Sequence, residues 1–130
     1  MPAGREAASL RSSKPTFDFY ELHILHHASD RQLYGLWMIE ELAEHGYQVN
    51  ASQLYPRFHR LEEKGYLDRS EKVVDGKQRK YYRLTREGKA YLKEQKRRLL
   101  ELISEALTVE ELSSALERRR KREEAKRLPA

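Results

Sequence analysis

The segment from residue 50 to residue 65 carries polar side chains along one edge and apolar side chains along the other. At about 100° per residue, a helix here places Ser52 and His59 opposite its leucines and phenylalanine, with Gln53 beside them. Hydroxyl, imidazole and amide groups donate and accept hydrogen bonds, which is what a helix needs to read base edges in the major groove of DNA. The alternative interpretation is an ordinary solvated helix face.

Cations lie beside this segment and after it. Arg57, Arg60 and Lys64 fall on the sides of the helix, where they would meet phosphates and position the helix without reading sequence. The basic residues after the helix fall on a predicted two-stranded hairpin, where crowded like charges repel each other. An adjacent phosphate backbone would relieve this repulsion. The alternative is an exposed strand edge that Lys and Arg protect from aggregation. Between residues 72 and 86 a single acidic residue accompanies six basic ones, namely Lys72, Lys77, Arg79, Lys80, Arg83 and Arg86.

Local signals predict the elements that hold these residues. Asn50 and Gln53 resemble a capping box at the start of the helix. Two strands are predicted over residues 66–74 and 77–84, joined by Asp75-Gly76, a dipeptide that favours the type I′ turn of a tight hairpin. This basic hairpin would form a wing beside the helix.

Two further helices are predicted ahead of the capping box. The first covers about residues 17–29, where apolar residues recur at three- and four-residue steps. The second covers about residues 32–45 and ends at Gly46. Its predicted apolar side consists of Leu33, Leu36, Ile39, Leu42 and Ala43.

A long helix is predicted over about residues 86–107, with Thr85 as its N-cap. Its apolar side chains cover more surface than one wing can bury, so we expect a partner subunit's helix to cover them. A last helix is predicted to begin at Thr108 and to end in the run of charged residues 117–127. This run is interpreted as a solvated helix end; the alternative is a contact for DNA or an acidic partner. The expected dimer contacts are Leu92, Leu99, Leu102, Ile103 and Ala106.

The composition of the 130 residues narrows the class of protein. Apolar residues make up 38% and charged residues 36%, which favours a mainly α domain with charged helices. The net charge of +5 is uneven: residues 1–50 sum to −3, residues 51–90 to +5 and residues 91–130 to +3. That excess favours phosphate-bearing partners such as double-stranded DNA. The absence of Cys fits a cytoplasmic location, and no apolar run is long enough to span a membrane.

These patterns predict a mainly α fold with a small β-hairpin, that is, a winged helix-turn-helix with a long C-terminal dimerisation helix. The predicted domains are a disordered arm (1–15), a DNA-binding winged helix (16–85), a dimerisation helix (86–107) and a C-terminal helix with a charged tail (108–130). No enzyme, cofactor or metal is predicted, because neither a glycine-rich phosphate cradle nor a nucleophile with a nearby base can be named.

Ordered motifs across about residues 17–107 resemble the PadR family of transcriptional regulators. The resemblance implies a homodimeric winged-helix repressor of the short-tailed type, and two-fold symmetry would match an inverted-repeat operator. By the same resemblance Tyr55 would contact a phosphate, and Lys77, Arg79 and Lys80 would hold the wing to the DNA backbone or minor groove. The motifs are Leu33-Tyr34-Gly35, Gln53-Leu54-Tyr55-Pro56, Leu61-Glu62-Glu63-Lys64-Gly65-Tyr66-Leu67 and Arg79-Lys80-Tyr81-Tyr82-Arg83-Leu84-Thr85-Arg86-Glu87-Gly88.

The sequence departs from the family pattern after Gly35, where members often carry an aromatic and then a polar residue. Here those positions are Leu36 and Trp37. Trp37 could serve in core packing, in a dimer contact or as a wall of a pocket for a small-molecule effector. Relatives that sense drugs through a Trp place it on the C-terminal helix, so multidrug sensing does not carry over.

Two alternative functions follow from the same residues. His23 and His27 share a helix face and, with Asp18 or Glu21, could serve a metal-responsive regulator, although two ligands do not make a site. A winged helix could also act only as a protein-interaction module, because fold does not determine function. The cations of the hairpin favour DNA over such a module.

Overall fold

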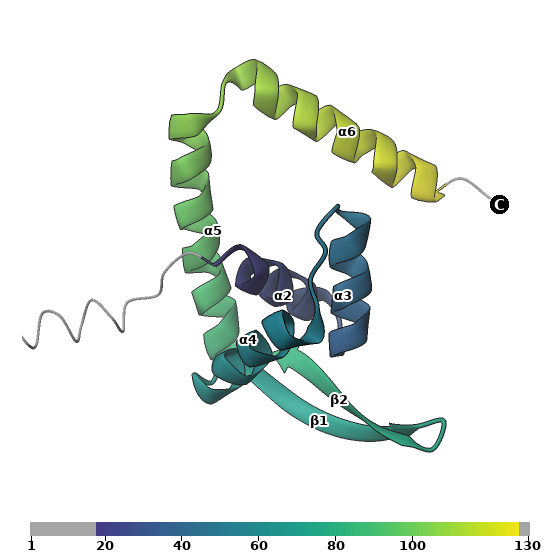
Figure 1. Cartoon of the computed structure of the whole chain (residues 1–130). Helices are drawn as coiled ribbons and strands as arrows, with labels where there is room; N and C mark the ends of the chain where they lie inside the picture. Colours follow the sequence, from purple (N-terminus) through teal and green to yellow (C-terminus); the bar gives the residue numbers. More distant parts are fainter. Residues whose placement is uncertain (1–17, 128–130) are drawn as a thin grey trace, which may run out of the picture. The chain divides into compact units, whose positions relative to one another are not determined.

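The computed structural model describes residues 18–127, so the predicted arm at residues 1–15 lies outside the described residues. It confirms a mainly α fold with one two-stranded antiparallel hairpin. Contacts divide the chain into two compact units, one ending at Gln95 and the other beginning at Lys96, within the long helix α5. The elements are α2 (Phe19–Asp30), α3 (Gly35–Glu44), α4 (Ala51–Glu63), β1 (Leu67–Val74), β2 (Lys77–Leu84), α5 (Arg86–Ala106) and α6 (Val109–Arg127) (Figure 1).

Helix α4 begins with the predicted capping box. The Asn50 side chain accepts a hydrogen bond from the backbone N–H of Gln53 at 3.0 Å, and the Gln53 side chain accepts one from the backbone N–H of Asn50 at 3.1 Å. Gly65 follows the helix with a φ of +82°, a left-handed conformation that glycine adopts without steric cost. Between these ends, Leu54 and Phe58 lie on the buried face.

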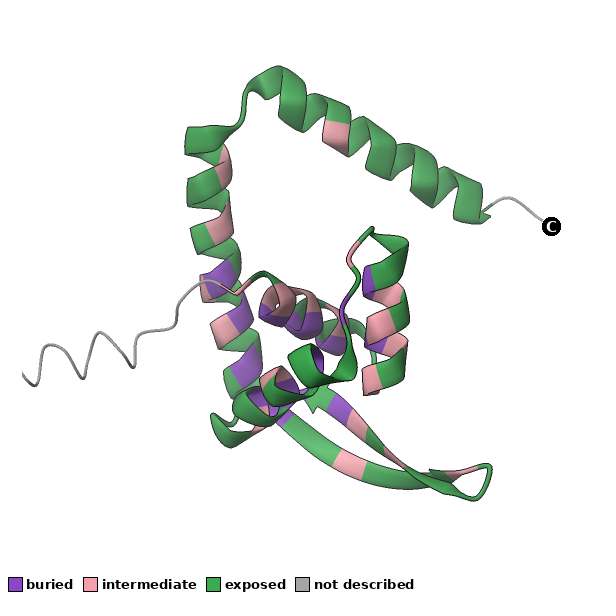
Figure 2. Cartoon of the chain, in the orientation of Figure 1, coloured by how far each residue is buried: buried purple, intermediate pink, exposed green. Residues whose placement is uncertain are grey.

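The hairpin has the predicted turn and register. β1 and β2 pair from Leu67 opposite Leu84 to Val74 opposite Lys77, which leaves Asp75 and Gly76 as a two-residue turn. Both turn residues have positive φ, +50° and +76°, as a type I′ turn requires. The turn projects away from the helices, and the outer part of the ribbon is largely exposed (Figures 1 and 2).

The second helix begins later than predicted. Leu33 forms an isolated antiparallel bridge with Tyr82, with backbone N···O distances of 2.9 and 2.8 Å, so it adds an extended residue to the edge of β2. Leu33 is therefore buried but outside the helix. The placement of Leu36 and Ala43 on the buried side was wrong, since Leu36 is 53% exposed and Ala43 is exposed, whereas Met38 is buried. Leu36 lies about 120° around the helix from Leu42, too far to share its face.

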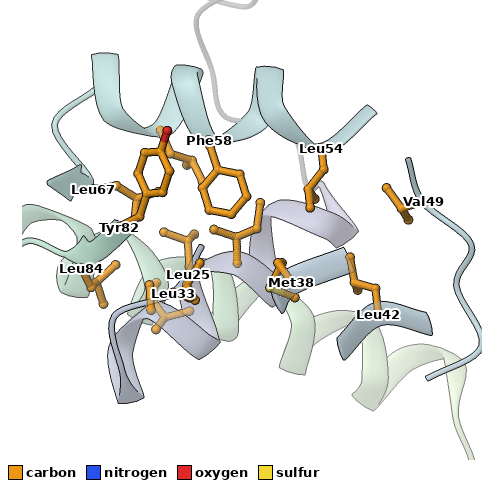
Figure 3. Packing of buried hydrophobic residues seen from close by; sticks show 14 residues of the cluster. Leu25, Leu33, Met38, Leu42, Val49, Leu54, Phe58, Leu67, Tyr82 and Leu84 are labelled. Carbon is orange, nitrogen blue, oxygen red and sulfur yellow. The ribbon is translucent and has the colours of Figure 1, made fainter. Parts of the chain in front are cut away.

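The core of the first unit joins the three N-terminal helices, the base of the hairpin and the start of α5 (Figure 3). The Phe58 ring lies against Tyr82 with centroids 4.6 Å apart, and this contact ties β2 to α4. Tyr81, on the other side of the strand, is half-buried against Tyr34. Tyr81 and Tyr82 therefore lie on opposite faces of the strand.

The second unit buries much less surface. Leu100 and Leu102 of α5 are more than half exposed, and α6 has no buried residue (Figure 2). A capping box starts α6, where Glu111 N–H donates to Thr108 Oγ1 at 3.1 Å and Thr108 N–H donates to Glu111 Oε1 at 2.9 Å. No helix in the described range is long and apolar enough to cross a membrane.

Candidate nucleic-acid interface

A cleft of about 320 Å³ opens between α4, the first turn of α3 and strand β2. Four of the predicted DNA-binding residues line it: Tyr55 and His59 come from the helix, and Arg79 and Lys80 come from the wing. His59 of the polar edge of α4 and two cations of the wing therefore share this cleft, whereas Ser52, Gln53, Lys64, Lys72 and Lys77 do not line it. The remaining lining residues are Tyr34, Gly35, Leu36, Gln78 and Tyr82.

Tyr55 reaches this cleft because its neighbour has no side chain. A Cβ on Gly35, the first residue of α3, would lie 2.2 Å from Cε1 and 2.9 Å from the hydroxyl oxygen of Tyr55. The ring therefore rests on the backbone of α3. Tyr55 remains 44% exposed.

Aromatic rings hold two cations of the wing. The Arg79 guanidinium lies 4.1 Å from the Tyr34 ring centroid and donates a 3.4 Å hydrogen bond to the Tyr81 hydroxyl, which raises the pKa of Arg79. The Lys72 ammonium lies 5.0 Å from the Tyr81 centroid and donates to Gln32 Oε1 at 3.0 Å. Lys72 and Arg79 face each other across the strands, so these contacts offset part of their mutual repulsion.

Other cations of the predicted set are free. In the part of the chain that the structure describes, the side chains of Lys64, Lys77 and Lys80 are exposed and have neither a hydrogen-bond nor an ion-pair partner. These ammonium groups are therefore available to an external anion such as a phosphate.

Arg57 and Arg60 are engaged within the protein. Arg57 Nε donates to both carboxylate oxygens of Asp18, at 3.1 and 3.0 Å. Arg60 Nε donates to Glu21 Oε1 at 2.7 Å, and the Glu21 side chain is only 8% exposed. These pairs tie α4 to α2, so a phosphate would compete with carboxylates for both guanidinium groups. Their contact with DNA stays a prediction.

The two polar residues of the first turn also serve the cap. Ser52 Oγ donates to Asn50 Oδ1 at 2.6 Å, and Gln53 Oε1 accepts the Asn50 backbone N–H. Gln53 keeps its side-chain NH₂ without a partner among residues 18–127. Both residues are exposed, and only the amide group of Gln53 retains donors that are unused in the cap.

The histidines other than His59 lie away from the cleft, on α2 and at the end of α3. His27 Nε2 is 3.6 Å from Glu41 Oε1, and its ring meets Trp37 edge-on at 5.3 Å. Burial, followed by the charge of neighbouring His26, lowers the pKa of His27 to about 4. Trp37 packs at the edge of the core with the Arg31 guanidinium 4.9 Å from its ring, so it does not line the cleft. The described residues contain no group of three or more side chains that could hold a metal ion.

The predicted dimer residues divide between the two units. Leu92 is only 5% exposed and belongs to the core of the first unit, which removes it from any surface that a partner could reach. Leu99 and Ile103 are half-buried, whereas Leu102 is 54% exposed and Ala106 is exposed. The prediction of dimer contacts therefore now depends on the other four residues, which all follow Gln95 in the chain: Leu99, Leu102, Ile103 and Ala106.

The sequence profile described as "Transcriptional regulator PadR-like family" matches residues 24–94. The chain belongs to the PadR-like family. The matched range contains α3, α4, both strands and the cleft between them. The winged-helix assignment and the class of transcriptional regulator are thereby confirmed.

Individual relatives support the same assignment for this PadR-like chain. It is 50% identical over 86 residues to Transcriptional regulator Rv3488 of Mycobacterium tuberculosis (strain H37Rv), covering 66% of this chain and 80% of that protein. The crystal structure of a PadR family transcriptional regulator from Eggerthella lenta is 29% identical with a TM-score of 0.62, covering 78% of this chain and 86% of that one. A transcriptional regulator from Clostridium thermocellum is 26% identical with a TM-score of 0.60, covering 68% and 92%.

Proposed function

We propose that this PadR-like chain is a sequence-specific DNA-binding repressor that acts as a homodimer on an inverted-repeat operator. The observation that carries the proposal is the shared cleft, which joins Tyr55 and His59 of α4 to Arg79 and Lys80 of β2. A duplex presents phosphates and base edges side by side, so it requires a protein surface with both kinds of group on one side.

In this proposal α4 enters the major groove. Gln53 and His59 meet base edges, because amide and imidazole groups match the donor and acceptor pattern there. Tyr55 donates its hydroxyl to a phosphate, and the free ammonium groups of Lys77 and Lys80 meet the backbone beside the groove. Ser52, Lys64, Lys72 and Arg79 surround these contacts, and Arg57 and Arg60 join them only where a phosphate displaces a carboxylate of α2.

The dimer is proposed to form through Leu99, Leu102, Ile103 and Ala106 of α5, whose apolar side chains require cover. A two-fold axis would then present the two copies of α4 to successive major grooves about 34 Å apart. Occupation of such an operator blocks a promoter. A small-molecule effector would regulate binding by favouring a different spacing of the two helices, with Trp37 as a residue to examine.

The test begins with selection of bound fragments from a random DNA pool, which identifies the operator. Affinity is then measured against salt concentration for the wild type, for a wing variant (Lys77→Gln with Lys80→Gln) and for Gln53→Ala. A matched control removes two exposed lysines of α5, Lys89→Gln with Lys93→Gln.

We expect the wing variant to bind every duplex more weakly and its salt slope to fall by about 0.9 for each phosphate that the wing no longer neutralises. Gln53→Ala should relax the preference at one or two base pairs at a cost of about 1–3 kcal/mol. The α5 control should resemble the wild type. Wing variants that leave affinity for all duplexes unchanged would refute the assigned interface, and a wild type that binds no duplex in a salt-dependent way would favour the protein-interaction module.

A further inference from the structure

Helix α6 carries a row of cations that the fold does not use. Arg118, Arg119, Arg122 and Lys126 lie within about 100° around the helix axis, and we call this set the α6 stripe. Among residues 18–127 none of the four has an acidic partner. Arg118 donates a hydrogen bond to Ser114 Oγ at 3.0 Å. Since α6 buries no residue, the stripe contributes nothing to a core.

The acidic residues nearby neutralise a different face of α6. Arg120 donates to Glu117 Oε2 at 3.1 Å and forms a second ion pair with Glu124. These pairs at three- and four-residue steps stabilise the helix. They leave the four cations of the stripe without an ion pair among residues 18–127, and Glu123, which flanks the stripe beside Arg119, forms none with them.

General helix energetics do not explain the stripe. Cations near a helix C-terminus interact favourably with the macrodipole, but only within the last turn, where Lys126 and Arg127 lie. Arg118 and Arg122 lie earlier, and their four-residue spacing brings like charges together at a cost of tenths of a kcal/mol per pair. An external polyanion would offset that repulsion.

The segment fits one class of polyanion best. Insertion into a membrane surface needs apolar side chains along the same turns as the cations, whereas Ala125 is the only apolar residue between 118 and 127. The exposed apolar residues of α6, namely Val109, Leu112 and Leu116, all precede the stripe. A specific protein interface needs aromatic or aliphatic anchors, which this segment lacks. Guanidinium groups suit phosphates, and the four-residue step repeats the charge about every 6 Å along the helix.

We propose that the α6 stripe contacts the phosphate backbone of duplex DNA, as a second electrostatic surface in addition to α4 and the wing. This inference rests on the proposed function. The family match ends at residue 94, so the stripe lies on a part of the chain that the shared PadR-like core does not include. Contacts of this kind would increase affinity for any sequence without reading bases.

The test uses the full chain and a pool of random-sequence duplexes of about 40 base pairs, with affinity measured by fluorescence anisotropy between about 50 and 200 mM salt. The stripe variant is Arg118→Gln with Arg122→Gln. The matched control, Arg120→Gln with Arg127→Gln, removes the same charge from the other side of α6. Glutamine keeps helix propensity in both variants.

If the stripe variant neutralises two phosphates fewer, the wild type should lose about tenfold more affinity over this salt range than the stripe variant. The control and a charge-preserving variant, Arg118→Lys with Arg122→Lys, should follow the wild type. A stripe variant with the wild-type salt slope would overturn the inference, as would a control that changes equally.

Binding to vesicles of phosphatidylglycerol is measured for the wild type and the stripe variant. If the stripe variant loses vesicle binding but keeps the wild-type affinity for duplex DNA, the stripe serves a membrane and the inference is overturned. The wing variant of Lys77 and Lys80 is measured in parallel. If the wing variant weakens binding and the stripe variant does not, only the inference fails. If neither variant weakens binding, the proposed interface itself fails.

Discussion

Gly35→Ala tests the link between α3 and the candidate interface. The new Cβ would lie 2.2 Å from Tyr55 Cε1, whereas ordinary contact begins at 3.4 Å, so the ring must move by about 1 Å or more. The obstacle is the end of a flexible, 44% exposed side chain, which can swing into solvent. We therefore expect little loss of stability, and alanine in place of glycine in a helix can even add up to about 1 kcal/mol.

The effect on binding should be much larger than the effect on folding. A hydroxyl–phosphate hydrogen bond requires an O···O distance of about 2.5–3.0 Å, and a shift of about 1 Å removes it. Hydrogen bonds to charged groups contribute about 1.5–3 kcal/mol, so affinity for the selected operator should fall roughly ten- to hundredfold for each bond removed. Anisotropy titration measures this loss, and urea unfolding measures stability in the same samples.

A double-mutant cycle decides whether Gly35 acts through Tyr55. Tyr55→Phe removes only the hydroxyl and should reduce affinity to a similar degree. In the Tyr55→Phe background, Gly35→Ala should then cost little more, because the bond that it disrupts is already absent. If the two losses multiply in the double variant, or if Gly35→Ala leaves operator affinity unchanged, the reasoning is refuted.

Three further changes test other contacts. Gly88→Ala should cost about 1–3 kcal/mol in urea unfolding, because its Cβ would meet the backbone carbonyl oxygen of Tyr66 at 2.2 Å; an unchanged midpoint would contradict this. Glu21→Gln should cost about 1–2 kcal/mol, since half-exposed Arg60 can recover hydration, and a neutral result in thermal unfolding would count against the ion pair. His27 has its pKa lowered from 6.5 to about 4 by burial, so the unfolded chain binds more protons in this window. Stability should be full above pH 6.5 and fall towards pH 4 by about 1 kcal/mol per unit, and His27→Gln should flatten that slope; an unchanged slope in urea titrations at each pH would exclude His27 as the cause.

The elements that carry the cleft could be predicted from the sequence because their signals are local. The Asn50–Gln53 capping box and the Asp75-Gly76 turn each depend on residues within one turn of the chain, and both appear as expected. The basic hairpin was expected beside this helix, and Tyr55 and His59 of α4 line one cleft with Arg79 and Lys80 of β2.

Contacts between distant residues could not be predicted in this way. Arg57 and Arg60 pair with α2 residues 39 positions away, and only carboxylates at the start of a preceding helix could have hinted at this. Leu33 was assigned to a helix because its apolar spacing fitted one, whereas pairing with Tyr82 outweighed that local preference. Leu92 was assigned to the dimer contacts because it follows the same apolar periodicity as the rest of the long helix. Periodicity does not distinguish apolar residues that pack in the chain's own core, as Leu92 does, from those that a partner would cover.

Helix α4 is held from both flanks in a way that leaves its outer edge free. On one flank Arg57 pairs with Asp18 of the α2 N-cap, and on the other Glu62 pairs with Arg69 of β1 at 3.4 Å. Partly exposed ion pairs such as these contribute little to stability individually. Their geometric effect is larger, because paired side chains on opposite flanks restrict rotation of α4 about its own axis. Such restriction would keep His59 and Tyr55 directed at the cleft before a partner arrives, which lowers the entropic cost of binding.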